Sequence, residues 1–461
     1  MLLKYIASIL CCLIIGSGIL IAQKEIPPEG GQPKDFKLPE KETYTLENGL
    51  KVTLVQYGTI PKVNASFKIR VGNINETENE VWLADLVADY LKEGTSTRTA
   101  REIAEAAASI GGEINTSTAM DFTTIAGEAL AEFAPELITL MSDILLHPQF
   151  PESELARLKN NYLRQLSVQK AKPQSLVQER FLKTLYPNHA YGRSLSTEAI
   201  IENFNISKVV NFYRTHFCAA KTNLYIVGMF DVKQVKEAIR KNLNQWLQGE
   251  TFVENLPKPF SERAVHLVDQ PGAAQSTIML GLPVIHPANP DYVPLLVTNA
   301  LLGGVFMSRI TTNIREDKGY TYTPFSLVSS RYRDAYWAQQ ASVGTEVTGP
   351  ALKEIFYEID RLHNEPPPSP ELMAIQNYLA GIFVLQNSSR NGIINQLSFV
   401  DLHGLDENYL TSYVRRVHAV TPVEVQRIMK TYLKSEKMTI VIVGDLGQIE
   451  GEVKAYGKII M

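Results

Sequence analysis

Asp85 and Asp89 are the first residues whose types and spacing could do chemistry, in the stretch WLADLVADYLKEGT. Residues four apart lie one above the other on a helix, so both carboxylates would share one stripe. The apolar residues of the stretch recur with helical spacing and predict an amphipathic helix: Trp82, Leu83, Leu86, Val87, Tyr90 and Leu91. A solvated helix face explains the two aspartates well, since two carboxylates without further oxygen ligands make a poor Ca²⁺ or Mg²⁺ site.

A second pair, Arg315 and Tyr322, stands in IREDKGYTY. A guanidinium and a neutral phenol are hydrogen-bond donors, and fixed donors suit an oxygen on which negative charge develops. The alternative is that REDK ends a charged helix and YTY begins a strand. This stretch alone favours the alternative. The preceding Gly303-Gly304 is not followed by the Lys-Ser/Thr of a phosphate loop and predicts a turn that lets a helix pack closely.

The remaining candidates for chemistry are histidines and one cysteine. The histidines lie in predicted loops or at helix ends, without the spacing of a helical pair, and are interpreted as surface or cap residues: His147, His189, His216, His266, His286, His363, His403 and His418. Cys218 follows His216 closely, but it enters a predicted buried strand, where cysteine usually acts as a small hydrophobic residue. We therefore expect Cys218 to pack rather than react.

The totals describe an ordinary globular protein: 461 residues, 45% hydrophobic and 20% charged, with a formal net charge of −4. This charge gives no support for nucleic-acid binding. Residues 1–22 carry one lysine and then an apolar run, which predicts a secretory signal peptide cleaved after Ala22 and a periplasmic or secreted protein. The alternative is an uncleaved membrane anchor, because the run approaches spanning length. Cys11 and Cys12 lie within it, so the mature chain would keep only Cys218 and form no internal disulfide.

The length predicts two domains. After an extended lead-in over 23–43, TYTLENGLKVTLVQY predicts a hairpin, 79–93 and 99–110 predict helices, and EINTSTAM and FTTIAGEAL predict strands. Long helical segments are predicted over 133–170, 175–186 and 196–215. NLYIVGMFDV resembles MTIVIVGDL, with Gly228 and Gly444 at matching places 216 residues apart (444 − 228), and ADLVADYLKEGT resembles PLLVTNALLGGV. Two similarities in the same order predict a duplicated α+β unit. The domains are 44–247 and 264–461, joined by a linker over 248–263.

Nine short stretches, in this order, resemble the pitrilysin-type (inverted zinc) metallopeptidase family, in the branch that includes mitochondrial processing peptidase. They are ENGLKV, LKEGT, AEAAASIGGEINTST, HPQFPESELARLKN, HAYGRSL, LYIVG, LLGGVFMSRI, IREDKGYTY and IVIVGD. The resemblance covers essentially the whole mature chain. It implies two homologous α/β domains, each an antiparallel-rich sheet flanked by helices, that form half of a clamshell.

The resemblance also implies a lost zinc site. Active relatives carry H-x-x-E-H on the first helix, two zinc ligands and a general base, and a third ligand, Glu, on a later helix. Here Asp85, Ala88 and Asp89 stand at the ligand, base and ligand positions, and the alignment puts Gln165 at the third ligand position, with a one-residue shift open. The resemblance therefore implies that this chain binds no catalytic zinc.

Arg315 and Tyr322 match an Arg/Tyr pair that contacts the substrate backbone in active relatives. The first hypothesis is therefore a non-zinc subunit of a heterodimeric metallopeptidase, which supplies Arg315 and Tyr322 while a related partner holds zinc and peptides are cleaved. The second is a non-catalytic peptide-binding or scaffold protein of the same family. The third, an active peptidase with a degenerate site, is disfavoured because Ala88 carries no carboxylate.

Overall fold

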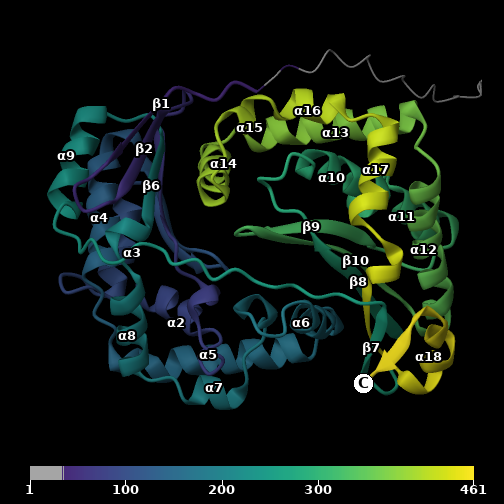
Figure 1. The fold of residues 1–461 in the computed structure, drawn as a ribbon. Coiled ribbons are helices and arrows are strands. Elements are labelled where there is room, and N and C mark those ends of the chain that lie inside the picture. The colour runs from purple at the N-terminus through teal and green to yellow at the C-terminus, as the bar shows by residue number, and fades with distance from the viewer. Residues whose placement is uncertain (1–33, 35) are drawn as a thin grey trace, which may run out of the picture. The chain divides into compact units, whose positions relative to one another are not determined.

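A computed structural model describes residue 34 and residues 36–461, and these contain two six-stranded sheets (Figure 1). The signal-peptide prediction and Cys11 and Cys12 lie outside the described residues. The first sheet has the order β1-β2-β6-β3-β5-β4. Its strands are β1 (Lys41–Thr45), β2 (Lys51–Gln56), β3 (Lys62–Ile69), β4 (Glu113–Thr118), β5 (Thr123–Leu130) and β6 (Thr222–Gly228).

The second sheet has the order β12-β7-β11-β8-β10-β9. Its strands are β7 (Ala264–Asp269), β8 (Gln275–Val284), β9 (Phe325–Arg331), β10 (Asp334–Gly344), β11 (Thr439–Gly444) and β12 (Lys458–Ile460). Five strands follow one another in the same spatial order in both sheets, as the predicted duplication requires. The sixth differs, because β1 joins β2 antiparallel from the N-terminal side, whereas β12 joins β7 parallel from the C-terminal side.

The two corresponding inner strands, β6 and β11, show why the apolar runs fold this way. The strand TIVIVG is buried at every position, and TNLYIVG at every position except Asn223. Each has one parallel and one antiparallel neighbour. A strand buried on both faces carries a near-continuous apolar run rather than an alternating one. The two similar sequence stretches therefore occupy equivalent places in the two sheets.

The helices of the first half refine two predictions. They are α2 (Leu83–Tyr90), α3 (Ala100–Ser109), α4 (Ala134–Leu146), α5 (Glu152–Lys170), α6 (Pro173–Leu185), α7 (Glu198–Glu202), α8 (Ile206–His216) and α9 (Val232–Leu243). The helical segment predicted over 133–170 is two helices, because the chain breaks at 147–151, where two prolines remove backbone donors. The expected helix over 196–215 is likewise two helices, since Asn205 caps a new one through the amide of Lys208.

The helices of the second half surround the second sheet (Figure 1). They are α10 (Tyr292–Asn299), α11 (Arg309–Thr311), α12 (Thr348–Asn364), α13 (Ser369–Gln386), α14 (Arg390–His403), α15 (Asn408–Thr411), α16 (Tyr413–Ala419), α17 (Pro422–Tyr432) and α18 (Leu446–Val453). Two π-helical segments, η5 (Ala300–Gly304) and η6 (Thr312–Asp317), flank α11.

The two halves exchange one helix each. Helix α6 of the first half contacts β8 and β11 of the second sheet, and α14 of the second half contacts β6 and β3 of the first sheet. A buried cluster accordingly joins Phe181 of α6 to Val441 of β11, and another joins Leu397 of α14 to Val227 of β6. Each sheet is therefore covered partly by a helix that the other half of the sequence supplies.

Residues 248–263 contain no helix or strand. Asp35–Met461 nevertheless forms one compact unit by its internal contacts. The predicted division into domains 44–247 and 264–461 stays a prediction about folding units, and β1 begins at Lys41, slightly ahead of the first of these boundaries.

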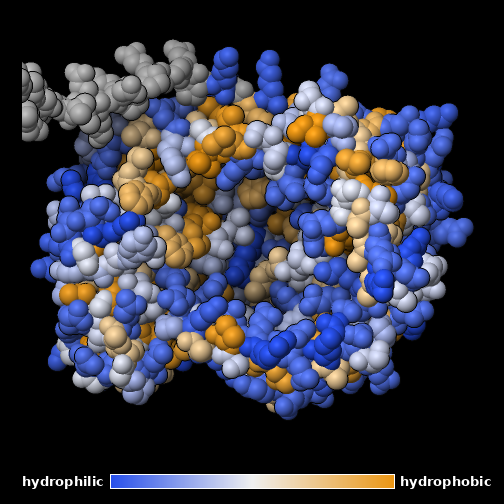
Figure 2. Space-filling view, turned by 180° about the vertical axis from the view of Figure 1, so that it is seen from behind, coloured by the Kyte–Doolittle hydropathy of each residue, from blue (hydrophilic) through white to orange (hydrophobic). Residues whose placement is uncertain are grey.

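One stretch in the described part of the chain, Tyr292–Asp317, is long and apolar enough to cross a membrane, with a mean hydropathy of 1.5. However, 67% of its most apolar window is buried inside the protein, as in the core helix of a globular domain. The face of the molecule drawn in Figure 2 is largely hydrophilic, with hydrophobic side chains in separate patches.

Candidate functional site

The helix that carries Asp85 and Asp89 begins in an unusual way. Trp82, just before α2, has a φ of 78°, in the left-handed region that non-glycine residues rarely adopt. The buried carboxylate of Glu76 accepts a hydrogen bond from the amide of Ala84 at 2.9 Å. This bond satisfies one of the amides that a helix N-terminus leaves open, so Glu76 caps α2 from a separate turn of chain.

Glu76, which is buried, and Asp85, which is half-buried, form an acidic pair. Asn73 donates through Nδ2 to Asp85 Oδ2 at 2.6 Å and to Glu76 Oε1 at 3.1 Å. Burial, and then the charge of Asp85, raises the pKa of Glu76 to about 8. Burial raises the pKa of Asp85 to about 6, against the opposing effect of the Asn73 hydrogen bond. At neutral pH this place therefore holds a protonated Glu76 beside an ionised Asp85.

Asp89 lies on the same helix and is held by α5. The hydroxyl of Tyr162 donates to Asp89 Oδ2 at 2.7 Å. Burial and the charge of Asp89 raise the pKa of the Tyr162 hydroxyl, which keeps it a neutral donor. The Tyr162 ring also packs 6.1 Å from the ring of Trp82. Asp89 thus has a fixed partner and does not sit on a simply solvated face.

The structure does not bring Gln165 to this cluster. The inward positions of α5 are Leu158, Tyr162 and Leu166, whereas Gln165 is exposed. Ala88, at the position of the base, is buried with 1% of its surface exposed and presents only a methyl group. Sequence reasoning missed Asn73, Glu76 and Tyr162, which do the hydrogen bonding here.

These residues do not fit a catalytic zinc ion. Zinc in such sites is held by deprotonated nitrogen or carboxylate donors aimed at one point. Here Asp85 and Asp89 each accept a hydrogen bond from a side-chain donor, and the raised pKa of Glu76 favours its protonated form. Among the described residues, no group of three His, Cys, Asp or Glu side chains is placed to hold a metal. The chemistry available is hydrogen bonding.

A second candidate cluster surrounds Arg315, which lies in the π-helical segment η6 beside the second sheet. Its guanidinium lies 4.4 Å from the ring centre of Phe306 and 4.8 Å from that of Tyr322. Nε also pairs with Glu316 at 3.1 Å. Tyr322 and Phe306 are 77% and 64% exposed. The structure therefore brings Arg315 and Tyr322 together, as stacked neighbours on an open surface.

The backbone around this cluster explains the two glycines before it. A Cβ on Gly303 would stand 2.5 Å from Gln339 Oε1 and 2.7 Å from Ser326 Oγ, and one on Gly304 would stand 2.5 Å from Asn299 Nδ2. A larger residue at either position would have to displace these side chains. The predicted turn is wrong, because Gly303 and Gly304 are the last residues of the π-helical segment η5, but the predicted close packing is present.

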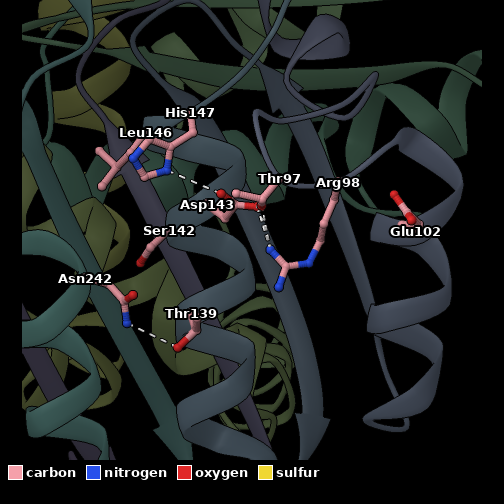
Figure 3. A pocket seen from close by; sticks show the side chains of 9 residues that line it. All are labelled: Thr97, Arg98, Glu102, Thr139, Ser142, Asp143, Leu146, His147 and Asn242. Carbon is pink, nitrogen blue, oxygen red and sulfur yellow. Dashed lines mark hydrogen bonds and ion pairs between the residues drawn. The ribbon is translucent and has the colours of Figure 1, made fainter.

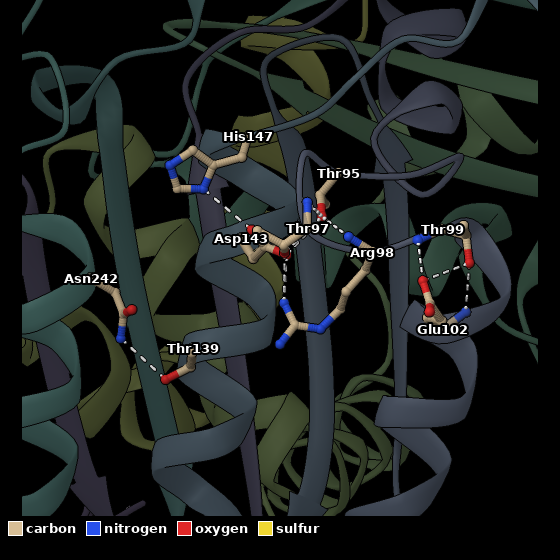
Figure 4. A network of polar contacts seen from close by, with 9 residues as sticks. All are labelled: Thr95, Thr97, Arg98, Thr99, Glu102, Thr139, Asp143, His147 and Asn242. Atoms are coloured by element: carbon tan, nitrogen blue, oxygen red, sulfur yellow. Dashed lines mark hydrogen bonds and ion pairs between the residues drawn. The ribbon is translucent and has the colours of Figure 1, made fainter.

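A third polar site, which the sequence did not single out, lies between α3, α4 and α9. Asp143 of α4 accepts hydrogen bonds from Thr95, Thr97 and Arg98, and pairs with His147 at 3.3 Å (Figure 4). Burial raises the pKa of Asp143, but these donors outweigh burial and hold it below its usual value.

A cavity of about 470 Å³ opens beside Asp143 (Figure 3). Because the Asp143 carboxylate is already occupied by protein donors, we interpret this site as a brace that ties the loop before α3 to the end of α4. The sequence gives no local signal for it, since Thr95 and Asp143 are 48 residues apart.

The positions of His266 and Cys218 test the expectations for the histidines and the cysteine. The expectation that the histidines lie in loops or at helix ends is wrong for His266, which is buried within β7 with neither ring nitrogen hydrogen-bonded. Burial lowers the pKa of His266, which favours its neutral form. Cys218 is buried beside Gly249, so its predicted packing role is confirmed.

Comparison with known proteins gives two family matches. The sequence profile described as insulinase (peptidase family M16) matches residues 51–199. The profile described as the peptidase M16 inactive domain matches residues 203–379. Together they span the candidate zinc-site helix and the Arg315–Tyr322 cluster.

Individual relatives and solved structures point to the same family. The chain is 27% identical to an uncharacterized zinc protease, YmxG, of Bacillus subtilis over 296 residues (63% of this chain and 71% of the relative). It is 24% identical to the non-peptidase homolog YmxG of Helicobacter pylori over 386 residues (82% and 87%). Its fold matches a peptidase M16 inactive domain from Pseudomonas fluorescens, with a TM-score of 0.82, 23% identity and coverage of 88% of this chain and 98% of that one. A protease from Helicobacter pylori gives a TM-score of 0.82 at 20% identity, covering 88% and 100%. These structures confirm the predicted fold class.

Proposed function

The chain belongs to peptidase family M16, the insulinase family, and from that premise we propose that it is the non-zinc subunit of a two-chain metallopeptidase that acts on peptides. The observation that carries the proposal is the contrast between two clusters. The helix that should hold zinc carries Asp85, Ala88 and Asp89, with both aspartates bound to protein donors. The Arg315–Tyr322 cluster, by contrast, is assembled and open.

The partner we propose is a related M16 chain with an intact H-x-x-E-H helix, which would supply the zinc ion. In this arrangement Tyr322 and Arg315 would donate to the carbonyl oxygen of the peptide bond as negative charge develops there. The stacking of Arg315 between two rings supports this role, because it limits the orientations of the guanidinium before substrate arrives. We also propose that the protein is exported, on the ground of its apolar first 22 residues.

The test compares turnover with assembly. Tyr322→Phe removes one donor and keeps the ring, and loss of one such donor slows the chemical step by about 10²–10³-fold. Arg315→Lys should also slow turnover, because an ammonium cannot reproduce the planar fork. Each variant is mixed with a related M16 chain that carries an intact H-x-x-E-H helix, and peptide cleavage is measured beside complex formation.

Tyr357→Phe is the control, since Tyr357 is an exposed tyrosine of α12 at 54% exposure and is not one of the rings stacked on Arg315. It should leave turnover unchanged. If Tyr322→Phe and Arg315→Lys assemble and cleave like the unmodified chain, the pair is structural. The alternative, a non-catalytic peptide-binding or scaffold protein, would then be favoured, and the name of the Helicobacter pylori relative is consistent with it.

A further inference from the structure

Helix α13 presents an apolar face that nothing in the described chain covers. Its 18 residues include one charged side chain, Glu371. The inward positions pack on the second core, while the outward face carries four exposed hydrophobic residues: Met373 (56% exposed), Tyr378 (42%), Val384 (48%) and Leu385 (66%). Exposed helices of globular proteins normally carry polar residues on their outer face. We call the outward residues Met373, Tyr378, Gly381, Val384 and Leu385 the α13 face; the exposed Asn377 lies among them as a polar member.

Gly381 stands in the middle of this face and has no steric reason to be glycine within the chain. A Cβ built there would meet nothing within 4 Å. A glycine inside a helix lowers helix stability relative to alanine. Gly392 of α14, by contrast, is explained by its neighbours, because a Cβ there would stand 1.7 Å from the carbonyl oxygen of Gln386. The open space over Gly381 is therefore suited to close approach by a second molecule.

The α13 face is fixed to the segment that carries the Arg315 cluster. Arg309 binds Glu371 with two hydrogen bonds, Nε to Oε1 and Nη2 to Oε2, both at 2.8 Å. Arg309 follows Phe306 and Met307, which are 64% and 55% exposed, and α13 contacts the preceding η5. Helices α13 and α16 run along the upper edge in Figure 1, and Figure 2 shows hydrophobic side chains along the same edge from behind.

Composition and size restrict what could cover this face. Helices that lie on membranes are rich in Lys and Arg on their polar side, and α13 contains neither. An 18-residue helix is about 27 Å long and about 10 Å wide, so its face offers roughly 300 Å². A stable interface buries about 800 Å² on each partner. The occupant must therefore extend well beyond α13, as a folded protein does and a short peptide does not.

We propose that the α13 face, with Gly381 at its centre, is the docking surface for the zinc-bearing M16 subunit. This inference rests on the proposed function, which requires such a partner next to the Arg315 cluster. Tyrosine and methionine are enriched in the centres of protein interfaces, and charged residues are depleted there. A side chain of the partner fills the space over Gly381, flanked by Tyr378 and Leu385 one turn away on each side.

The experiment measures the affinity of this chain for a related M16 chain with an intact H-x-x-E-H helix by isothermal titration calorimetry. Gly381→Leu fills the space, and Leu385→Arg puts a charge on the face. Loss of a central contact weakens binding by about 30-fold or more. Gly451→Leu in α18, where a Cβ also meets nothing within 4 Å, and Val423→Arg in α17, at 68% exposure, are the matched controls. Both should bind within about threefold of the unmodified chain.

Folding is monitored separately by thermal unfolding, in which Gly381→Leu should raise the transition temperature while it weakens binding. If the unmodified chain binds its partner and the α13 variants bind equally well, the docking proposal fails and the proposed function survives. If the unmodified chain does not bind that partner at all, both fail. A homodimer in sedimentation, or binding to anionic vesicles, that either α13 variant abolishes would assign the face to another occupant and overturn the proposal.

Discussion

Glu76 is buried next to the start of α2, where its carboxyl group accepts hydrogen bonds from the Ala84 amide and the Asn73 side chain. The position of the missing catalytic base is filled by the methyl group of Ala88, and the two ligand positions by carboxylates that bind protein donors. A site of this kind stabilises a turn and orients a helix. Its acidity is tuned by burial, and that has a measurable consequence.

Glu76→Gln tests this tuning through the pH dependence of stability. The pKa of Glu76 is about 8 in the folded chain, above that of an unfolded glutamate at about 4.3. Between these values the folded state holds a proton that the unfolded state has released, so stability falls as pH rises from about 4.3 to about 8. Glutamine keeps the acceptor oxygen without ionising. The variant should therefore be more stable than the unmodified chain at pH 9, by about 2–4 kcal/mol, with little difference at pH 4.5.

Urea unfolding from pH 4.5 to pH 9 measures the difference. Glu78→Gln, at an exposed position of the same turn, is the control and should not change the slope. A Glu76→Gln variant that follows the pH dependence of the unmodified chain would show that Glu76 ionises normally in the fold.

At the scale of elements, the exchange of α6 and α14 decides how the duplicated units are held together. Phe181 of α6 is fully buried and meets the ring of Tyr336 of β10 at 5.7 Å, in an edge-to-face arrangement. Tyr186, just after α6, donates to Asp334 at the start of β10. On the other side, Tyr225 of β6 donates to Asp401 of α14. Each helix thus forms part of a core that belongs mainly to the other half.

Phe181→Ala should therefore weaken the second sheet, although Phe181 belongs to the first half of the sequence. Deleting a buried phenyl ring costs about 3–5 kcal/mol. The substitution should speed amide hydrogen exchange more in β8 and β11 than in β2 and β3. Val168→Ala in α5, where the side chain is 52% exposed, is the control. Faster exchange confined to the first sheet would contradict the helix exchange.

At the scale of the whole molecule, the linker over 248–263 is fixed by side-chain contacts to both halves of the chain. The Arg70 guanidinium lies 3.6 Å from the ring centre of Phe252 and 3.9 Å from that of Tyr332. Tyr332 in turn donates to Glu254. The linker is therefore clamped between a residue after β3 and the turn between β9 and β10. This clamp gives a reason why Asp35–Met461 forms one compact unit despite two sheets.

Arg70→Ala should release the linker. Cation–π contacts of this kind are worth about 0.5–2 kcal/mol, so loss of the clamp should speed cleavage at Glu254 by a glutamate-specific protease about 2- to 30-fold. Arg101→Ala in α3, where the side chain is 86% exposed, is the control. Equal cleavage rates in the two variants would show that other contacts hold the linker.

The sequence by itself determined the architecture, and it shows which residues stand where active relatives carry H-x-x-E-H. Apolar runs such as TIVIVG and TNLYIVG specify buried strands because burial on both faces leaves no place for polar side chains, and their repetition indicated the duplicated unit. Asp85, Ala88 and Asp89 could be read directly, since residue type alone decides whether an imidazole is present. Arg315 and Tyr322 were singled out because they match an Arg/Tyr pair of the family, since their own stretch favoured a helix end followed by a strand.

Only the tertiary structure decided what replaced the lost site. Successive side chains of a helix point about 100° apart. An alignment that is uncertain by one residue in α5 therefore cannot distinguish the exposed Gln165 from the buried Leu166, which lies one turn after Tyr162. The contact between Tyr162 and Asp89 spans 73 residues, and that between Arg70 and Tyr332 joins different halves. The exchange of α6 and α14 likewise depends on which core receives each helix. Local sequence pattern specifies that a face is apolar, but packing across the chain specifies what the face meets.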